Sequence, residues 1–420
     1  MSDTPTRRAI EAVWRVEAAR LIGGLVRIAR DVDRAEDLAQ EALLVALERW
    51  PVTGIPDNPG AWLMTTAKHR ALDERRRRAM VEAKHGELER SAPASTTLDE
   101  EALDEPIGDD VLRLVLIACH PILSKDARVA LTLRLVAGLS TAEIARAFLT
   151  PEATIAQRIV RSKRTLAEAK APFEVPTGAD LHARVPPALE VVYLIFNEGY
   201  AATAGEDWIR PELCEEAMRL GRMLVALVPE DAEAHGLLAL MELQASRTKA
   251  RLGPHGEPVL LSAQDRTKWD RLLITRGLAA LARAVALARP LGPYALQAAI
   301  AACHATAPTL ADTDWPRVVA LYDALAELTG SPIVALNRAV AVSMAYGPGE
   351  GLALVDELGD EPALRDYHLL AAVRGDLLVK LGRTDEAKIE LERAARLATN
   401  EPERALLLAR ASRCGDRSSS

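Results

Sequence analysis

The chain is poor in cysteine, in aromatic residues and in long apolar runs, and each shortage excludes a class of protein. Only four of its 420 residues are cysteines, and Cys119, Cys214, Cys303 and Cys414 lie far apart without a Cys-x-x-Cys pair. A clustered zinc or redox site is therefore not expected, and we interpret the four as buried cytosolic thiols. Aromatic residues are 4% of the chain, and no sustained alternating run predicts a strand.

Long apolar segments are absent as well. No uninterrupted apolar stretch reaches the roughly 18 residues that a helix needs to cross a bilayer. Residues 1–10 are polar and lack the apolar core of a signal peptide. The sequence shows no metal-ligand cluster, phosphate-binding loop or nucleophile–base pair. We therefore expect a cytoplasmic protein without membrane contact, catalytic residues, cofactor or bound metal.

Helix-forming residues are abundant instead. Ala, Leu, Arg and Glu dominate the composition, which predicts an all-α fold. A chain of 420 residues is too long for one ordinary compact domain and suggests two to four units.

Charge is distributed unevenly along the chain. The formal net charge is −8 overall, but residues 1–85 carry +2, residues 86–108 carry −6, residues 109–170 carry +4 and residues 171–420 carry −8. Such asymmetry indicates different partners for different parts, with nucleic acid a candidate only for the two basic blocks.

Composition also predicts the boundaries of the parts. Residues 86–108 are rich in Ser, Thr and acids, and residues 172–188 hold Pro172, Pro176, Gly178, Pro186 and Pro187, so both segments are expected to be linkers. The expected parts are a helical unit at 1–85, an acidic flexible linker at 86–108, a second helical unit at 109–171, a linker at 172–188, a helical array at 189–412 and a disordered tail at 413–420.

The array from residue 189 onward has short Pro/Gly breaks between helical segments, which predicts stacked helical hairpins. Its end resembles a tetratricopeptide unit, because Gly375, Ala387, Leu391 and Ala394 have the spacing of such a repeat. Ala353 precedes Ala387 by one period of 34, although Glu357 stands where an apolar residue is expected.

A helix-turn-helix is predicted within residues 140–168. Ser140 and Glu143 form a capping box, in which each side chain satisfies a free backbone donor of a short helix at 141–148. Leu149 and Thr150 make the turn, with Thr150 as the expected cap of the next helix and Pro151 at its first position.

The second helix has two distinct faces. Ile155, Ile159, Ser162 and Leu166 form a packing face. The other face suits the major groove of DNA and holds Thr154, Gln157, Arg158, Arg161 and Arg164. A solvated cationic face is the alternative for this helix taken alone.

Two further helical segments carry candidate surfaces. One has an acidic stripe with an apolar member, Asp37, Gln40, Glu41 and Leu44, which suits docking on a basic protein surface, although a solvated face is equally common. The other places Trp62, Thr66, His69 and Asp73 opposite a packing side of Leu63, Met64, Ala67 and Ala71, and ends in Arg75, Arg76, Arg77 and Arg78. Arginines suit phosphates and a flat ring suits stacking on exposed bases.

Together, residues 10–170 resemble an extracytoplasmic-function sigma factor of bacterial RNA polymerase. The resemblance implies two small helical sigma domains and promoter DNA and polymerase core as partners, the core through its β′ clamp helices and β subunit. It assigns polymerase binding to Asp37, Gln40, Glu41 and Leu44. It assigns the −10 element to Trp62, Thr66, Lys68, His69, Arg70, Arg75, Arg76, Arg77 and Arg78. It assigns the −35 element to Thr154, Gln157, Arg158, Arg161, Lys163 and Arg164.

The match departs from the family at three positions. His69 stands where asparagine is common, Ala156 where lysine is common and Gln157 where serine is common. These departures leave the promoter sequence open.

The remainder resembles the subgroup of these factors with a long tetratricopeptide-like extension, described as regulatory. Motifs around residues 193–200, 215–220 and 264–270 carry this likeness. Six polar or aromatic residues stand out as regulatory candidates that would contact the sigma domains, a partner or a ligand: Asn197, Glu198, Tyr200, Asp265, Arg266 and Trp269. Helix caps and buried ion pairs are the structural alternative for them.

Two other functions compete with a sigma factor. A stand-alone helix-turn-helix regulator would leave the acidic stripe and the Trp62 helix unexplained. A repeat scaffold would make the N-terminal half an accessory. An enzyme fits least.

Overall fold

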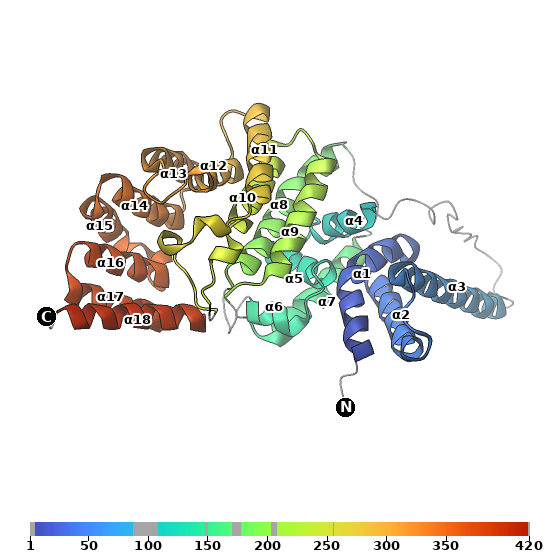
Figure 1. The fold of residues 1–420 in the computed structure, drawn as a ribbon. Coiled ribbons are helices and arrows are strands. Elements are labelled where there is room, and N and C mark those ends of the chain that lie inside the picture. Colours follow the sequence, from blue (N-terminus) through green and yellow to red (C-terminus); the bar gives the residue numbers. More distant parts are fainter. Residues whose placement is uncertain are drawn as a thin grey trace. The chain divides into compact units, whose positions relative to one another are not determined.

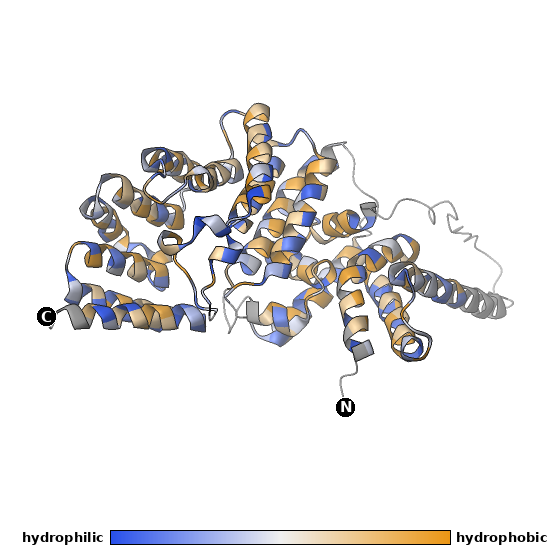
Figure 2. Ribbon diagram, viewed as in Figure 1, coloured by the Kyte–Doolittle hydropathy of each residue, from blue (hydrophilic) through white to orange (hydrophobic). Residues whose placement is uncertain are grey.

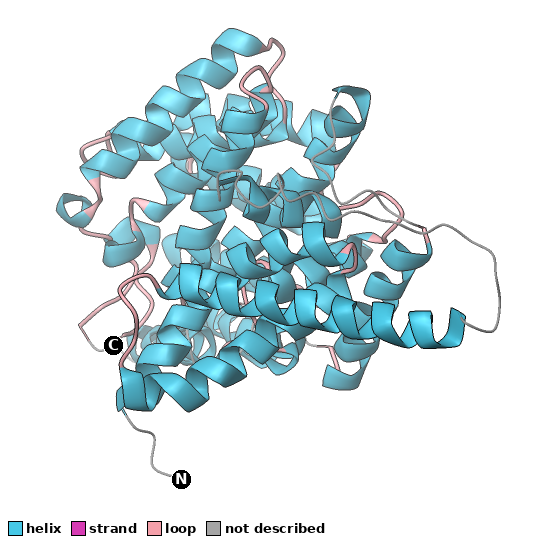
Figure 3. Ribbon diagram, turned by 90° about the vertical axis from the view of Figure 1, so that its right-hand side faces the viewer, coloured by secondary structure: helices cyan, strands magenta, loops and turns pink. Residues whose placement is uncertain are grey.

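A computed structural model describes residues 5–86, 108–147, 150–169, 178–202, 208–254 and 256–418. These residues form helices joined by short loops, and Figure 3 shows no strand among them. The only β-type pairing recorded in these ranges is an isolated bridge between Leu252 and Pro258. The predicted all-α fold is confirmed. The chain separates into two compact units, Met1–Val191 and Val192–Ser420.

The first three helices of unit 1 are α1 (Pro5–Ala29), α2 (Val32–Thr53) and α3 (Pro59–Gly86) (Figure 1). Asp31 caps α2 by accepting a 2.8 Å bond from the backbone of Arg34, and Gly54, at φ 83°, ends the helix. Left-handed backbone at that point favours glycine. The three helices pack on one another around large fully buried side chains, which include Leu25, Leu38, Trp50 and Leu63.

Four shorter helices follow in unit 1: α4 (Gly108–Ala118), α5 (Lys125–Leu135), α6 (Thr141–Ala147) and α7 (Glu152–Glu168). Ser124 caps α5. The buried side chains Leu114, Leu131, Ile144 and Leu166 come from all four helices and form their shared core. The expected linker at 86–108 lies, between its end residues, outside the described residues.

The expected linker at 172–188 requires a correction. Residues 178–188 are the first half of a long helix, α8 (Gly178–Tyr200), with Pro186 and Pro187 inside it. Residues 172–177 lie outside the described residues. Proline costs helix stability, but Val185, Leu189 and other apolar residues of α8 are buried, and their packing outweighs that cost.

Unit 2 continues from α8 as a succession of helices: α9 (Pro211–Leu227), α10 (Ala232–Ala245), α11 (Arg271–Leu287), α12 (Pro293–Thr306), α13 (Trp315–Thr329), α14 (Pro332–Tyr346), α15 (Pro348–Glu357), α16 (His368–Lys380), α17 (Thr384–Leu397) and α18 (Glu401–Ser418). Short 3-10 turns lie at Thr248–Ala250 (η2), Leu261–Ala263 (η3), Arg266–Lys268 (η4), Leu358–Asp360 (η5) and Pro362–Leu364 (η6). Successive helices pack on each other. Figure 2 shows hydrophobic and hydrophilic residues side by side along them.

The helical hairpins are tightest where glycine faces a neighbouring helix. A side chain at Gly375 of α16 would meet Leu391 of α17 at 2.9 Å, and one at Gly277 of α11 would meet Leu243 of α10 at 2.7 Å. Gly375, Ala387 and Leu391 therefore pack as the tetratricopeptide spacing predicts. Ala353 does not take part, because it is exposed.

The expected disordered tail at 413–420 also requires a correction. Helix α18 continues to Ser418, and the buried Leu407, Ala411 and Cys414 hold it against the α16–α17 core. Residues 419 and 420 lie outside the described residues. No helix among the described residues is long and apolar enough to cross a membrane.

Candidate nucleic-acid and protein interfaces

Helix α7 has the two faces that its sequence predicts. Ile155, Ile159, Ser162 and Leu166 are buried. On the other side Thr154, Gln157, Arg161 and Arg164 are exposed. Arg164 makes a 2.6 Å ion pair with Glu168 at the surface. Packing therefore holds the helix while its opposite face presents cationic and hydrogen-bonding groups to solvent.

The capping box that begins this helix-turn-helix is formed. The backbone of Ser140 donates to Glu143 Oε2 at 2.7 Å, and the backbone of Glu143 donates to Ser140 Oγ at 3.2 Å. Phe148 and Leu149 lie outside the described residues. The expected cap at Thr150 is wrong by one residue, because Pro151 is the N-cap and its carbonyl accepts bonds from the backbones of Thr154 and Ile155.

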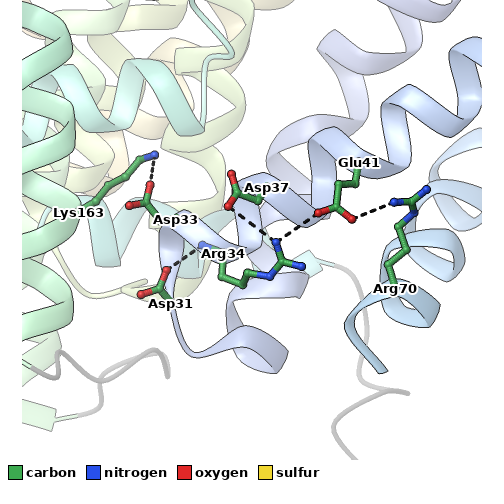
Figure 4. Close-up of polar contacts among 7 residues, drawn as sticks. All are labelled: Asp31, Asp33, Arg34, Asp37, Glu41, Arg70 and Lys163. Carbon is green, nitrogen blue, oxygen red and sulfur yellow. Dashed lines mark hydrogen bonds and ion pairs between the residues drawn. The ribbon is translucent and has the colours of Figure 1, made fainter. Parts of the chain in front are cut away.

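Two predicted DNA contacts of α7 are engaged within unit 1. Arg158 is half-buried and lies 3.5 Å from Asp126. Lys163 Nζ lies 2.6 Å from Asp33 of α2 (Figure 4). It also lies 2.7 Å from Glu36 of the same helix. Burial lowers the pKa of Lys163, but its bonds to these two carboxylates outweigh burial and the pKa is raised. Nine residues separate Lys163 from Thr154, which places them about 180° apart on the helix, so Lys163 points away from the DNA face.

The acidic stripe of α2 lies at the surface. Asp37, Gln40 and Leu44 are exposed, and the Leu44 residue is 59% exposed. Arg34 lies 3.3 Å from Glu41 and 3.8 Å from Asp37, which keeps the carboxylates in place (Figure 4). The stripe thus combines negative charge with an exposed apolar side chain.

The start of helix α3 lies against the last part of α2. Trp62 is half-buried, with its ring 5.2 Å from the ring of the buried Trp50. Thr66 bonds back to the carbonyl of Trp62, and Lys68 is half-buried. His69 and Arg70 are exposed.

The exposed Arg70 makes a 3.0 Å ion pair with Glu41 of α2 (Figure 4). This pair joins the predicted −10 surface to the predicted polymerase surface. The positions of Arg75, Arg76, Arg77 and Arg78 lie in α3, but their side chains are outside the described residues.

Three residues near the α2 stripe were missed by sequence reasoning: Asp33, Glu36 and Arg134. Arg134 of α5 donates to Glu36 at 2.9 Å, and Glu36 also accepts from Gln40. Asp33, Gln40 and Leu44 have the spacing of one helix face, which the sequence alone can indicate. No local sequence signal predicts that Lys163 contacts this face.

A small cavity borders the same stripe. It has a volume of about 340 Å³ and is lined by residues of α1, α2 and the end of α5, which include Trp14, Glu36, Gln40, Leu44 and Arg134. Two predicted polymerase-binding residues, Gln40 and Leu44, therefore border a cavity that is also lined by Arg134 of α5, in the second helical unit.

In unit 2, the candidates at 197–200 lie at the end of α8. Glu198 is buried and accepts a 3.0 Å bond from Arg210, whereas Asn197 is half-buried. The Tyr200 ring stacks on Phe196, and the Arg251 guanidinium lies 3.7 Å from its centroid. The Tyr200 hydroxyl has no hydrogen-bond partner among the described residues.

The regulatory candidates Asp265, Arg266 and Trp269 make contacts with nearby backbone atoms and apolar side chains of unit 2. Asp265 caps η4 through Thr267, and this hydrogen bonding lowers the pKa of its carboxyl. Arg266 donates at 2.6 Å to the carbonyls of His304 and Ala307 at the end of α12. Trp269 is buried in an apolar cluster. These contacts match the structural alternative for Asp265, Arg266 and Trp269.

The four cysteines are free and buried. Burial raises the pKa of Cys119 and that of Cys214 to about 12. A thiol with such a pKa stays protonated near neutral pH and is a poor nucleophile or metal ligand. The interpretation of the cysteines as buried thiols is confirmed.

Matches to known sequence families divide the chain near the boundaries that its composition predicts. Residues 15–80 match sigma-70 region 2, residues 113–166 match sigma-70 region 4, and residues 184–285 match a family of unknown function (DUF6596). In unit 1, region 2 therefore covers most of α1, α2 and α3, and region 4 covers α5, α6 and most of α4 and α7.

Whole proteins similar to this chain include an uncharacterized protein of Rhizobium meliloti, which is 43% identical over 388 residues, 92% of this chain and 91% of that protein. The ECF RNA polymerase sigma factor SigL of Mycobacterium tuberculosis is 31% identical over 158 residues, 37% of this chain and 86% of SigL. The probable ECF RNA polymerase sigma factor SigI of the same species is 26% identical over 239 residues, 52% of this chain and 80% of SigI.

Proposed function

We propose that separate surfaces of this chain bind polymerase, bind promoter DNA and regulate activity. The chain belongs to the extracytoplasmic-function family of RNA polymerase sigma factors. Sigma factors are promoter-recognition subunits and not enzymes. The chain directs RNA polymerase core to promoter DNA at transcription initiation. This membership decides against the stand-alone regulator and the repeat scaffold.

The α2 stripe docks on polymerase in this proposal, on the clamp helices of the β′ subunit. The observation that carries it is the exposure of Leu44 on the face of α2 that also holds Asp37, Gln40 and the half-buried Glu41. An exposed apolar side chain amid acidic groups is typical of a surface that a basic partner covers. The β subunit is the expected second contact of the core.

The DNA surfaces are the exposed face of α7 and a set of exposed and half-buried residues at the start of α3. Thr154, Gln157, Arg161 and Arg164 present donors of the kind that read base edges and hold phosphates, which suits the −35 element. Trp62, Thr66, Lys68, His69 and Arg70 lie within three turns at the start of α3 and are proposed to hold the −10 element. Arg158 joins the −35 contacts if its pair with Asp126 opens, since that pair is exposed on the Asp126 side.

Unit 2 is proposed to regulate the sigma regions or to bind a partner or ligand. Its support is the end of α8, where the guanidinium groups of Arg247 and Arg251 lie over the ring of Tyr200. The Tyr200 hydroxyl has no hydrogen-bond partner among the described residues. Among the described residues neither arginine makes an ion pair with a carboxylate, and two such guanidinium groups suit an anionic ligand or an acidic segment.

Co-purification with core polymerase tests the docking proposal. Asp37→Lys with Glu41→Lys reverses the charge of the stripe, and we expect binding to core to fall at least about tenfold, because close charge pairs across interfaces contribute on the order of 1 kcal/mol or more. Glu357→Lys, an exposed reversal in unit 2, is the matched control. Equal binding by the stripe variant and the control would refute docking through α2.

Truncation after Tyr200, which keeps all of α8, tests the regulatory proposal. The SigL alignment covers 86% of SigL within 37% of this chain, so most of a sigma factor corresponds to little more than a third of this chain. We expect promoter-specific transcription in vitro by the truncated chain to differ from that by the full chain. Equal transcription and equal polymerase affinity would remove the regulatory role.

A further inference from the structure

We propose that unit 2 binds the phosphate group of a small molecule between Arg247 and Arg251, next to the hydroxyl of Tyr200. This inference names the ligand class for the regulatory role proposed for unit 2, and it rests on that role only for its effect on transcription. Two observations on the described residues carry it. The two guanidinium groups meet at one ring and have no carboxylate partner, and buried polar atoms near them have no hydrogen-bond partner.

The two arginines flank one short turn. Arg247 directly precedes η2 and Arg251 directly follows it, so both side chains come from the turn that follows α10. The Arg251 carbonyl accepts a 2.8 Å bond from the Val259 backbone. The Ser246 carbonyl, just before Arg247, accepts a 2.7 Å bond from the Asp270 backbone. Because both ends of the turn are bonded to residues farther along the chain, the two side chains start from fixed positions.

Both guanidinium groups converge on the ring of Tyr200, the last residue of α8. The guanidinium carbon of Arg251 lies 3.7 Å from the ring centroid, and that of Arg247 lies 5.6 Å from it. The two carbons are therefore at most about 9 Å apart, which is the sum of these distances. A phosphate that accepts hydrogen bonds of about 2.8 Å from both groups bridges a gap of that size. Arg251 also donates to the Tyr200 carbonyl, which holds it at this ring.

The positive charge at this ring is not balanced by acids. Neither Arg247 nor Arg251 makes an ion pair within the described part of the chain, and the Arg247 side chain donates to the neutral Gln244 at 2.8 Å. Arg251 is only 7% exposed. A buried guanidinium without a counter-ion is costly, because its charge has lost contact with water. An anion that binds here is therefore attracted by charge that the protein itself leaves unpaired.

A third arginine adds to the positive charge. Arg266 donates at 2.6 Å to backbone carbonyls at the end of α12, so it supplies charge more than free hydrogen-bond donors. Burial lowers the pKa of Arg251, of Arg266 and of His304. In each case the nearby charge of Arg247 lowers the pKa as well. Like charges gathered in one place without counter-ions are typical of a site for an anion.

Buried polar atoms without a hydrogen-bond partner lie around these arginines. Among the residues that the structure describes, they include the Tyr200 hydroxyl, Nδ1 of His304 and Nε1 of Trp269. Such atoms cost free energy unless a ligand, an ion or water provides the partner. The Tyr200 hydroxyl belongs to the ring that both arginines contact, and it is a donor that suits a phosphate oxygen.

Charge and size favour phosphate over a carboxylate or a segment of protein chain. A phosphate monoester carries close to two negative charges and three acceptor oxygens, whereas a carboxylate carries one charge. Arginine binds phosphate through parallel N–H bonds in a planar fork. Arg251 and the hydroxyl oxygen of Tyr200 are buried, so a ligand that reaches both must be compact.

Calorimetric titration of the full chain with inorganic phosphate tests the site. At about pH 8 phosphate is mainly a dianion, and sodium chloride keeps the ionic strength constant. We expect saturable binding with a Kd of roughly 1 mM or below, and at least about tenfold weaker binding of acetate. Absence of saturable binding, or equal binding of acetate, overturns the proposal. Glycerol 3-phosphate, titrated alike, distinguishes the sources: tighter binding than that of inorganic phosphate assigns the site to a monoester, and weaker binding assigns it to free phosphate.

Removal of one unpaired guanidinium locates the binding. Arg247→Gln should weaken phosphate binding at least about tenfold, because a charge-assisted contact is lost. Arg219→Gln in α9 is the matched control, since Arg219 is also half-buried and also bonds a residue three positions earlier, Glu216. Unchanged phosphate binding by Arg247→Gln, or an equal loss in the control, overturns the proposal.

A second variant keeps every charge. Tyr200→Phe retains the ring and removes only the hydroxyl, which has no partner among the described residues, so the chain should not be destabilised. Phosphate binding should nevertheless weaken at least about fivefold, because the phosphate loses a donor. Unchanged phosphate binding by this variant overturns the site as proposed.

Transcription in vitro separates this inference from the regulatory proposal. A phosphate-dependent change in promoter-specific transcription by the full chain, absent in Arg247→Gln, supports both. Phosphate binding with the expected variant pattern but without an effect on transcription supports the site and removes its regulatory role. Absence of binding overturns the site, whatever truncation after Tyr200 does to transcription.

Discussion

Two residues of α7 that are two positions apart should have different roles, one in stability and one in promoter selection. Ile159 is 5% exposed in the core of the helix-turn-helix, whereas Arg161, two residues later, is exposed. Ile159→Ala removes buried apolar atoms and leaves a cavity, at a cost of about 3 kcal/mol. Arg161→Ala removes no packing and should change stability by less than about 0.5 kcal/mol.

Native-state hydrogen exchange of the α7 backbone measures the first effect. A loss of about 3 kcal/mol makes exchange about 150 times faster in Ile159→Ala if exchange follows opening of this unit. In Arg161→Ala the exchange rate should change by less than about threefold. The second variant keeps the helix and serves as the structural control for the first.

Transcription in vitro from templates with altered −35 sequences measures the second effect. If Arg161 reads a base, Arg161→Ala lowers activity on the cognate template by about 5- to 150-fold, corresponding to about 1–3 kcal/mol, and relaxes discrimination at one position. If Arg161 holds a phosphate, the loss is uniform across templates and the salt dependence weakens. Unchanged transcription, or equal destabilisation by both variants, would refute the assignment of the two faces.

A helix cap, two buried thiols and a buried histidine each have a measurable effect. Ser140→Ala breaks the reciprocal cap of α6 and should cost about 1 kcal/mol, seen as faster amide exchange in α6; an unchanged rate contradicts the capping role. Because burial raises the pKa of Cys119 and that of Cys214 to about 12, only about one such thiol in 10⁴ is ionised at pH 8. Both should resist a thiol reagent until the chain is unfolded, and rapid native labelling would argue against their burial. Burial and two nearby arginines lower the pKa of His304 to about 4 from 6.5, so protonation favours the unfolded chain. Stability of unit 2 should be constant above about pH 6.5 and fall towards pH 4, and His304→Gln should reduce that fall; an equal fall in the variant would assign it to other groups.

The fold class and the two faces of α7 are predictable from sequence because they depend on local periodicity. Ile155, Ile159 and Leu166 recur at helical spacing, and the capping box of Ser140 and Glu143 is formed within four residues. Such features need no knowledge of distant segments. The Pro/Gly breaks of the array likewise coincide with helix ends, for example at residues 292–293 and 330–332.

The features that sequence reasoning misses depend on tertiary packing. Pro186 and Pro187 indicate a linker, but the apolar side of α8 keeps them in a helix. The exposed Ala353 has the spacing of a repeat without its packing. Lys163 belongs to the family's recognition pattern, yet its angular position on α7 directs it to α2. Pairing across 130 residues of sequence has no local signal, so only the folded chain shows it.

As a sigma factor, this chain selects promoters as a subunit of RNA polymerase. The most direct test of this role is run-off transcription with purified core polymerase, on templates with intact and scrambled −35 and −10 elements. We expect a defined start site only when core, chain and intact template are combined, with weak, salt-sensitive DNA binding by the chain alone. Tight, sequence-specific DNA binding without polymerase, together with no transcript from the complete mixture, would contradict it.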